Sequence, residues 1–111
     1  MRQTNLSFEE LISIFHDPKG CTLPLCLIVN EIGELAKEND DRAFQKLLSF
    51  LRAKDPSLRF IALAWLNECG NPAALESIYE LLKTEKHEWV VEAAAEAKNH
   101  LEIILGWTPR N

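Results

Sequence analysis

A repeat of about 31 residues limits what this chain can fold into, because it makes the two halves of residues 40–105 superimpose. After this shift Leu47 falls on Ile78, and Leu51 falls on another leucine, so apolar positions match along both copies. Each copy is too short to bury its apolar side chains alone, and stacking on neighbouring copies builds a continuous core. We therefore expect a stack of similar units.

Each unit has the residue pattern of two helices, because apolar side chains recur every three or four positions and alternating strand patterns are nearly absent. Ser7 and Glu10 have the spacing of a capping box, and Asp55 is suited to start a helix. Gly70 and Gly106 are suited to end one. The six predicted helices cover approximately residues 8–15, 24–37, 43–53, 57–69, 71–83 and 88–105.

These helices predict a single all-α domain over residues 1–111, folded as a right-handed α-α superhelix of about three stacked antiparallel helix pairs. A chain of this length is able to bury one core. The first pair is the most degenerate and has the longest internal turn. The predicted repeats span approximately residues 6–38, 40–70 and 71–105, followed by a tail at 106–111.

Two tryptophans near the end of the chain receive different interpretations. Trp89 aligns with Leu58 in the repeat, so we expect its side chain to lie in the core. Trp107 lies in the tail. There it either folds back over the open end of the stack, since terminal repeats need a cap, or docks on another subunit.

Residues 40–105 resemble HEAT-like repeats, and the subtype they most resemble is the one shared by bilin lyases. Residues 55–62 read DPSLRFIA and are similar to the family pattern D-P-x-V-R-x-x-A. Residues 70–83 resemble the pattern G-D-P-x-A-x-x-x-L-x-x-L-L that begins a repeat. Val90 departs from the family, which usually has arginine there, and the resemblance before residue 40 is weak. The resemblance implies the fold and says little about function.

The resemblance also implies three enzyme functions to compare with the residues. Bilin lyases attach linear tetrapyrroles to proteins, and nothing in this sequence isolates a bilin site. Deoxyhypusine hydroxylases bind two irons through several His-Glu pairs, whereas this chain has one, His87-Glu88, in a turn. HEAT-like DNA glycosylases hold DNA in a basic groove, which the net charge of −5 argues against. We expect no enzyme activity, no cofactor and no nucleic-acid partner, with lyase-like activity as the alternative.

The sequence argues against a metal site and against a membrane location. His16, Cys21 and Cys26 supply three of the four ligands that a zinc site normally needs, so we interpret the cysteines as small apolar residues. No apolar run approaches the roughly 18–20 residues of a membrane helix. The N-terminal residues lack the hydrophobic segment of a signal peptide. We expect a cytoplasmic protein without a metal or a membrane partner.

The predicted partner surface is the face that the second helices of the pairs turn away from the core. Phe60 and Leu63 are large apolar residues to leave in water, and exposed apolar patches mark partner sites. Arg59 and Lys98 would select acidic features on the partner. The alternative is that these side chains pack against neighbouring second helices. The predicted partner-binding residues are Arg59, Phe60, Leu63, Asn67, Val91, Ala94 and Lys98.

The sequence therefore favours a protein-interaction adaptor whose partner is another protein. Two alternative functions stay open. A bilin-lyase-like or tetrapyrrole-handling protein would show visible absorbance after mixing with a bilin. A self-associating structural protein would join copies through its open repeat ends, and a mass measurement in solution would reveal the homo-oligomer.

Overall fold

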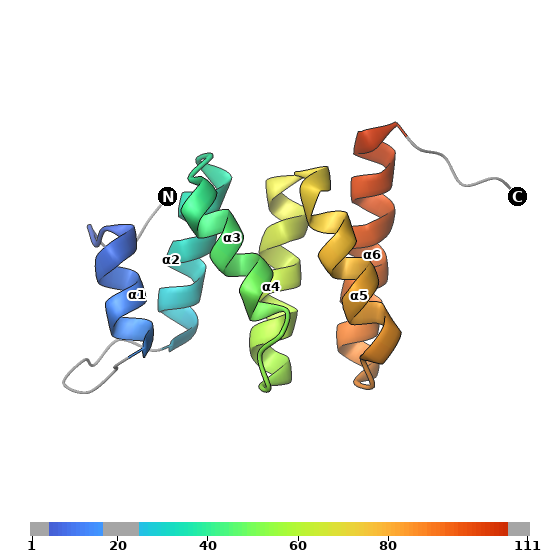
Figure 1. The fold of residues 1–111 in the computed structure, drawn as a ribbon, viewed down its shortest axis with the longest axis horizontal. Coiled ribbons are helices and arrows are strands. Elements are labelled where there is room, and N and C mark those ends of the chain that lie inside the picture. Colours follow the sequence, from blue (N-terminus) through green and yellow to red (C-terminus); the bar gives the residue numbers. More distant parts are fainter. Residues whose placement is uncertain (1–4, 17–24, 107–111) are drawn as a thin grey trace, which may run out of the picture.

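The computed structural model describes residues 5–16 and 25–106 (Figure 1). Every regular element in this part of the chain is helical, which confirms the predicted all-α class. The helices alternate in direction and form three antiparallel pairs placed side by side (Figure 1). The elements are α1 (Phe8–His16), α2 (Leu25–Lys37), α3 (Asp41–Phe50), α4 (Pro56–Cys69), the short 3-10 helix η1 (Pro72–Ala74), α5 (Leu75–Thr84) and α6 (Glu88–Leu105).

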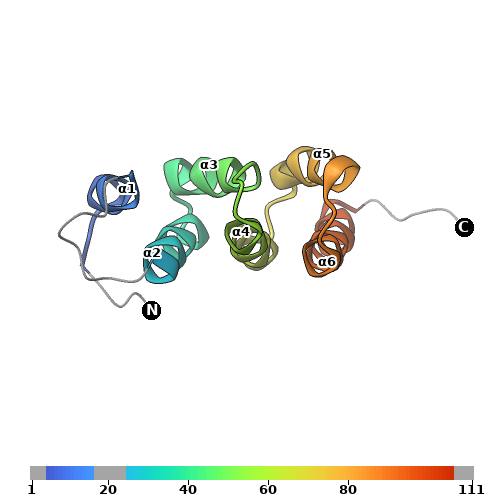
Figure 2. The ribbon, with the colours of Figure 1, turned by 90° about the horizontal axis from the view of Figure 1, so that it is seen from below.

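The three pairs place their helices in two layers (Figure 2). The first layer contains α1, α3 and α5, and the second layer contains α2, α4 and α6. Within the second layer α4 packs directly against both α2 and α6, whereas α3 and α5 barely touch in the first layer. The core therefore lies between the layers and continues between the second helices. In this region α4 buries Ala62, Leu63 and Leu66, and α6 buries Val90, Ala94, Ala97 and Leu101.

Polar side chains start α1, α3 and α4, and the starts at Ser7 and Asp55 are the predicted ones. Ser7 and Glu10 form the capping box: Glu10 Oε1 accepts from the Ser7 N–H at 2.8 Å, and Ser7 Oγ accepts from the Glu10 N–H at 3.2 Å. Asp40 caps α3, because its Oδ1 accepts from the Arg42 N–H at 3.0 Å. Asp55 caps α4 in the same way, at 2.8 Å.

Two of the second helices, α4 and α6, end at the predicted glycines, whereas α2 ends at Lys37 and is followed by Asn39 with a left-handed φ of 73°. Gly70 and Gly106 adopt left-handed φ angles of 65° and 88°, which end α4 and α6. In the first layer the boundaries differ from those predicted. The third helix stops early at Phe50, because the chain leaves it in a turn at Leu51. The fifth helix starts as the 3-10 turn Pro72–Ala74, with its proline in the first position.

Three predicted side-chain positions are wrong. Leu63 and Ala94 were expected to face a partner, and both are fully buried. Leu63 is buried because α4 has α2 on one side, α6 on the other and α3 behind it, and Ala94 is buried because α6 packs against both α4 and α5. Trp89 was expected in the core and is 42% exposed, because it lies in the first turn of α6 against the ring of Phe60 at the surface. Trp107 lies outside the described residues.

Candidate functional site

An exposed pair of aromatic rings lies where α4 and α6 meet on the outer face of the second layer. Phe60 is 41% exposed and Trp89 is 42% exposed. Their ring centroids are 5.6 Å apart with an interplanar angle of 64°, an edge-to-face arrangement. The His87 ring packs against the same tryptophan, also with a centroid distance of 5.6 Å. This aromatic cluster of Phe60, His87 and Trp89 is held in place by its own contacts and still leaves large apolar area in water.

The same seam between α4 and α6 continues toward a polar contact. Asn67 Oδ1 and His100 Nδ1 are joined by a hydrogen bond of 2.6 Å. Ala64 lies one helical turn after Phe60 on α4 and is exposed, so a small side chain occupies the middle of the seam. The predicted residue Asn67 is therefore at this surface, with its side-chain oxygen already hydrogen-bonded across the seam.

Acidic side chains accompany the aromatic cluster along α6. Glu88, Glu92 and Glu96 are exposed and follow each other at intervals of four residues, so they lie along one side of the helix. Among the described residues none of the three forms an ion pair. The outer face of α6 thus combines a tryptophan with uncompensated negative charge.

The second layer is also cross-linked between α2 and α4. Trp65 donates its indole N–H to Asn30 Oδ1 at 2.7 Å. The indole lies so close to α2 that a Cβ at Gly33 would overlap it. Lys37 and Glu68 add an exposed ion pair at 3.3 Å. The glycine is therefore a requirement of this close approach between helices.

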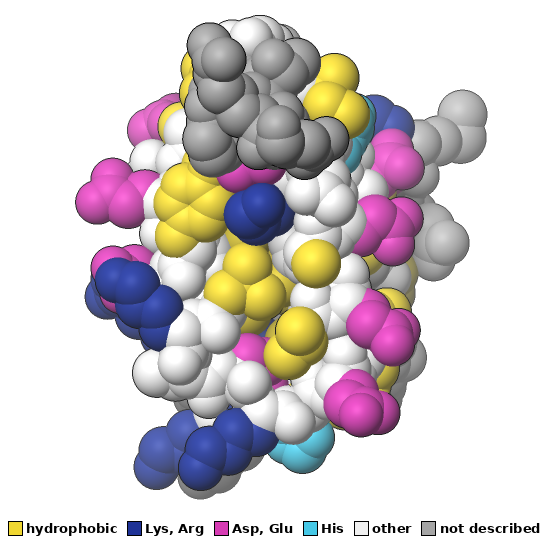
Figure 3. Space-filling view, turned by 90° about the vertical axis from the view of Figure 1, so that its right-hand side faces the viewer, with side chains coloured by type: hydrophobic (Ala, Val, Ile, Leu, Met, Phe, Trp, Pro, Cys, Tyr) yellow, Lys and Arg dark blue, Asp and Glu magenta, His cyan; other side chains and the backbone are white. Residues whose placement is uncertain are grey.

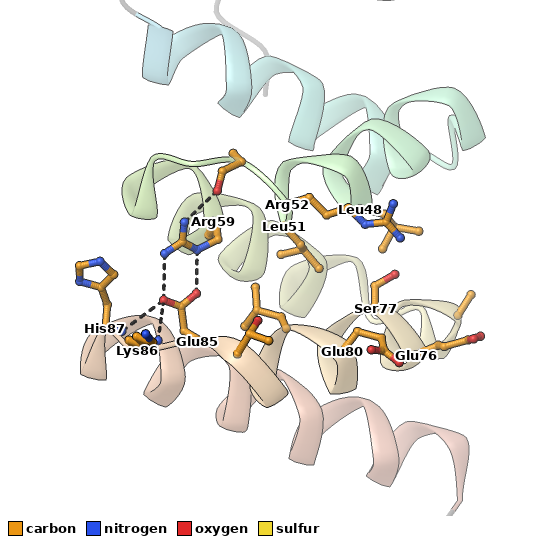
Figure 4. Close-up of a pocket in the computed structure, with 14 residues that line it drawn as sticks. Leu48, Leu51, Arg52, Arg59, Glu76, Ser77, Glu80, Glu85, Lys86 and His87 are labelled. Carbon is orange, nitrogen blue, oxygen red and sulfur yellow. Dashed lines mark hydrogen bonds and ion pairs between the residues drawn. The ribbon is translucent and has the colours of Figure 1, made fainter.

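Arg59 was predicted to contact a partner, but its guanidinium group forms hydrogen bonds within the protein. Its Nε and Nη2 donate to the two carboxylate oxygens of Glu85 at 2.7 and 2.9 Å (Figure 4). Its Nη1 donates to the carbonyl oxygens of Ala53 and Lys54 at 2.8 and 3.1 Å. The side chains of Arg59 and Glu85 are only 15% and 3% exposed. The pair therefore ties the start of α4 to the turn between α5 and α6.

Electrostatics follow from this pairing. The Arg59 guanidinium holds the pKa of the Glu85 carboxyl below its usual value, and the carboxylate raises the pKa of Arg59 in turn. Glu85 Oε2 also accepts from the backbone N–H groups of Lys86 and His87, both at 3.2 Å. These donors favour the ionised carboxylate. The charged Glu85 side chain therefore holds the turn before α6, in which His87 of the aromatic cluster lies.

Lys98 is likewise paired inside the protein. Its Nζ lies 3.3 Å from Glu102 Oε1, and the Glu102 side chain is only 1% exposed. Tyr79 donates its hydroxyl to Glu102 Oε2 at 2.6 Å, and this hydrogen bond raises the pKa of Tyr79. The network joins α5 to α6 at the open end of the stack, which is the face seen in Figure 3. Val91 is half-buried on the same helix.

A groove of about 660 Å³ separates α3 from α5 in the first layer. Leucine side chains and a mixture of acidic and basic groups line it, and the Arg59–Glu85 pair closes one end (Figure 4). Neither this groove nor the exposure of Trp89 was predicted from the sequence. The repeat shift relates Leu48 to Tyr79 and so indicates that both side chains face the same way along the stack, but it does not indicate how far apart α3 and α5 lie.

The described part of the chain contains no candidate metal site and no candidate membrane-spanning helix. No three side chains among its histidines, cysteines, aspartates and glutamates are grouped to hold a metal ion. Of the predicted pattern, Cys21 lies outside the described residues, and so does the side chain of Cys26. Cys69 is half-buried, and burial raises the pKa of its thiol. None of the described helices combines the length and the apolar character needed to cross a membrane.

Comparison with known proteins agrees with this architecture. A sequence profile described as HEAT repeats matches residues 26–98, which is well over half of the chain. No curated protein and no solved structure matches it. HEAT repeats generally mediate protein–protein interaction and are typically not enzymes. Because the described helices form three stacked pairs and the matched residues reach from α2 into α6, the chain belongs to the HEAT repeat family.

Proposed function

We propose that this chain is a protein-interaction adaptor whose partner docks on the outer face of α4 and α6. The observation that carries the proposal is the exposed Phe60–Trp89 pair beside the seam. Tryptophan is among the residues that contribute most to binding energy at interfaces, and aromatic rings fixed before binding lose little rotamer freedom. The proposed surface is the same face of the second helices that the sequence predicted. Its two apolar anchors are Phe60 and Trp89, because Leu63 is buried.

The charges beside the rings specify a basic partner, which reverses the selectivity expected from the sequence. Arg59 and Lys98 are paired with Glu85 and Glu102, so neither is a free cation. The exposed charge next to Trp89 is mainly negative, because the three glutamates of α6 outnumber the one exposed lysine, Lys86, in the preceding turn. Charge complementarity across an interface favours the right partner and speeds association. The partner surface would therefore present an apolar side chain flanked by lysine or arginine.

Affinity capture with a matched pair of variants tests this function. Wild-type protein and the Phe60→Ala/Trp89→Ala variant are used to capture proteins from a lysate of the source organism, and each captured protein is then measured with purified components. We expect one stoichiometric partner whose affinity falls about thirtyfold or more in the variant. The Ile104→Ala/Leu105→Ala variant removes exposed apolar side chains elsewhere on α6 and should retain the partner.

Charge provides the second arm of the same experiment. Glu92→Gln/Glu96→Gln should weaken the same complex and reduce its sensitivity to salt, because exposed charges are screened by ions. A partner that binds the aromatic variant with wild-type affinity would rule out the proposed surface. Visible absorbance after mixing with a linear tetrapyrrole would favour the bilin-handling alternative, and a concentration-dependent mass would favour self-association.

A further inference from the structure

We infer that the groove between α3 and α5 is a second docking site, which accepts an amphipathic helix with basic residues along one edge and an acidic residue along the other. This inference goes beyond the proposed function, because it gives the chain a second site in addition to the Phe60–Trp89 surface. The groove belongs to the first layer, whereas the Phe60–Trp89 surface faces outward from the second layer (Figure 2). His87 is the member of the aromatic cluster that also lines the groove, whereas Phe60 and Trp89 lie outside the groove lining.

The shape of the groove follows from how the layers pack. Because α4 lies close to both neighbours while α3 and α5 barely touch, the first layer keeps an elongated opening of about 660 Å³. That volume falls within the range of roughly 300–1,000 Å³ typical of ligand sites. Leu48 of α3 is half-buried and leaves part of its side chain in the groove, whereas Leu51, in the turn after α3, and Leu81 of α5 line it as nearly buried side chains that are 5% and 7% exposed. Leu48, Ala53 and Ala73 therefore supply the accessible apolar surface for an apolar stripe of the occupant.

The charges on the two rims differ in sign. Glu76 and Glu80 stand one helical turn apart on the α5 rim, and Arg52 lies on the α3 rim (Figure 4). Arg52 and Glu76 form no ion pair with any described residue. Glu80 pairs with Lys83, and because both side chains are about two-thirds exposed this contact adds little energy. An occupant gains from two cations on one edge and one anion on the other.

The surrounding backbone favours a helix over an extended segment. The N–H and C=O groups in the middle of α3 and α5 are already hydrogen-bonded within those helices. A segment lying on the leucines therefore finds side chains and almost no free main-chain partners. Its own backbone groups have to be satisfied internally, and an amphipathic helix in a groove achieves this.

The two ends of the groove also select a direction. Lys86 and His87 lie at the end closed by the Arg59–Glu85 pair, and Glu76 lies toward the opposite end (Figure 4). The C-terminus of a helix carries negative partial charge and its N-terminus carries positive partial charge. The docked helix therefore runs parallel to α5, with its C-terminus beside Lys86.

A designed peptide that matches the groove tests the site directly. The probe is a fluorescein-labelled synthetic amphipathic helix of about four turns, with a leucine stripe, two lysines one turn apart on one edge and a glutamate on the other. Binding is measured by fluorescence polarisation. Glu76→Lys/Glu80→Lys should weaken binding about tenfold, because two attractive contacts become repulsive. A peptide with the charges exchanged should recover binding to this variant, which also shows that the variant is folded.

The controls separate this site from the proposed function. Phe60→Ala/Trp89→Ala should bind the probe as wild type does, since those rings lie outside the groove. The inference is overturned if the probe does not bind wild-type protein, if the groove variant binds it equally well, or if only the aromatic variant loses it. Loss of the natural partner in the aromatic variant would leave the adaptor proposal standing in each of these cases.

Discussion

The two layers of the stack are built from the same repeats and differ in how closely their helices approach. In the second layer small residues allow the helices to meet: Gly33 lies under the Trp65 indole, and Ala94 and Ala97 of α6 are fully buried beside α4. In the first layer Leu48 and Leu81 stand at the sides of an open groove. One repeat thus yields a closed face with exposed rings and an open face with a cavity, because residue size differs between the layers.

Leucines from the two layers provide the largest expected difference. Leu63→Ala should lower the free energy of unfolding by about 2–5 kcal/mol, because the side chain is fully buried between second helices. Leu48→Ala should lower it by about 1 kcal/mol, since this side chain is only half-buried beside the groove. Urea unfolding followed by circular dichroism measures both. Equal losses would mean that the layers are packed alike.

The second-largest expected effect on the free energy of unfolding comes from the ion pair between Arg59 and Glu85. Arg59→Ala should lower the free energy of unfolding by about 1–3 kcal/mol, because it leaves the buried Glu85 carboxylate without its main partner. The pKa of Glu85 is lower in the folded protein than its usual 4.5, so this stabilisation is fully present above that pH and is lost as the pH falls through the folded value.

Acid unfolding of two variants provides the check. Glu85→Gln should flatten this part of the stability curve, whereas a matched Glu80→Gln change at an exposed site should leave its slope as in wild type. Identical acid transitions in all three proteins would contradict the assignment.

The closeness of the second layer is probed by adding one methyl group. Gly33→Ala places a Cβ against the Trp65 indole, so one of the two helices has to shift, and we expect a loss of about 1–3 kcal/mol. Trp65→Leu leaves room for that methyl group. In this background the alanine should cost much less, which a double-mutant cycle of thermal unfolding would show. If the effects of the two substitutions simply add, the Trp65 indole does not contact the backbone at Gly33.

The smallest effect is expected at the surface of the second layer. Lys37→Ala removes an ion pair whose two side chains are 51% and 61% exposed, so the free energy of unfolding should change by less than about 0.5 kcal/mol. Raising the salt concentration should abolish even this difference. A change as large as that of Arg59→Ala would show that exposed contacts between second helices hold the stack together.

The sequence predicted the parts of the fold that depend on local chemistry. Asp55 and Gly70 bound α4 as expected, since a cap and a left-handed stop depend only on neighbouring residues. The surface was harder to predict, because exposure depends on neighbours in space. Leu63 reads as a solvent-facing position on an isolated helix and is buried by α6, while Trp89 inherits a core position from Leu58 and lies outside. The partner of Arg59, Glu85, lies 26 residues further along the chain, so only the fold brings the two together. The partner of Lys98, Glu102, lies one helical turn away on α6, and this pair could have been predicted from the spacing of the two residues.

The hydrogen bonds that cross the second layer have a mechanical consequence. Asn30 with Trp65, and Asn67 with His100, fix the spacing of neighbouring second helices at two seams. No comparable close contact fixes α3 to α5. Flexing of the stack is therefore expected to pivot about the second layer and to widen or narrow the opposite side. A helix seated between α3 and α5 would act as a wedge that sets the curvature of the whole molecule.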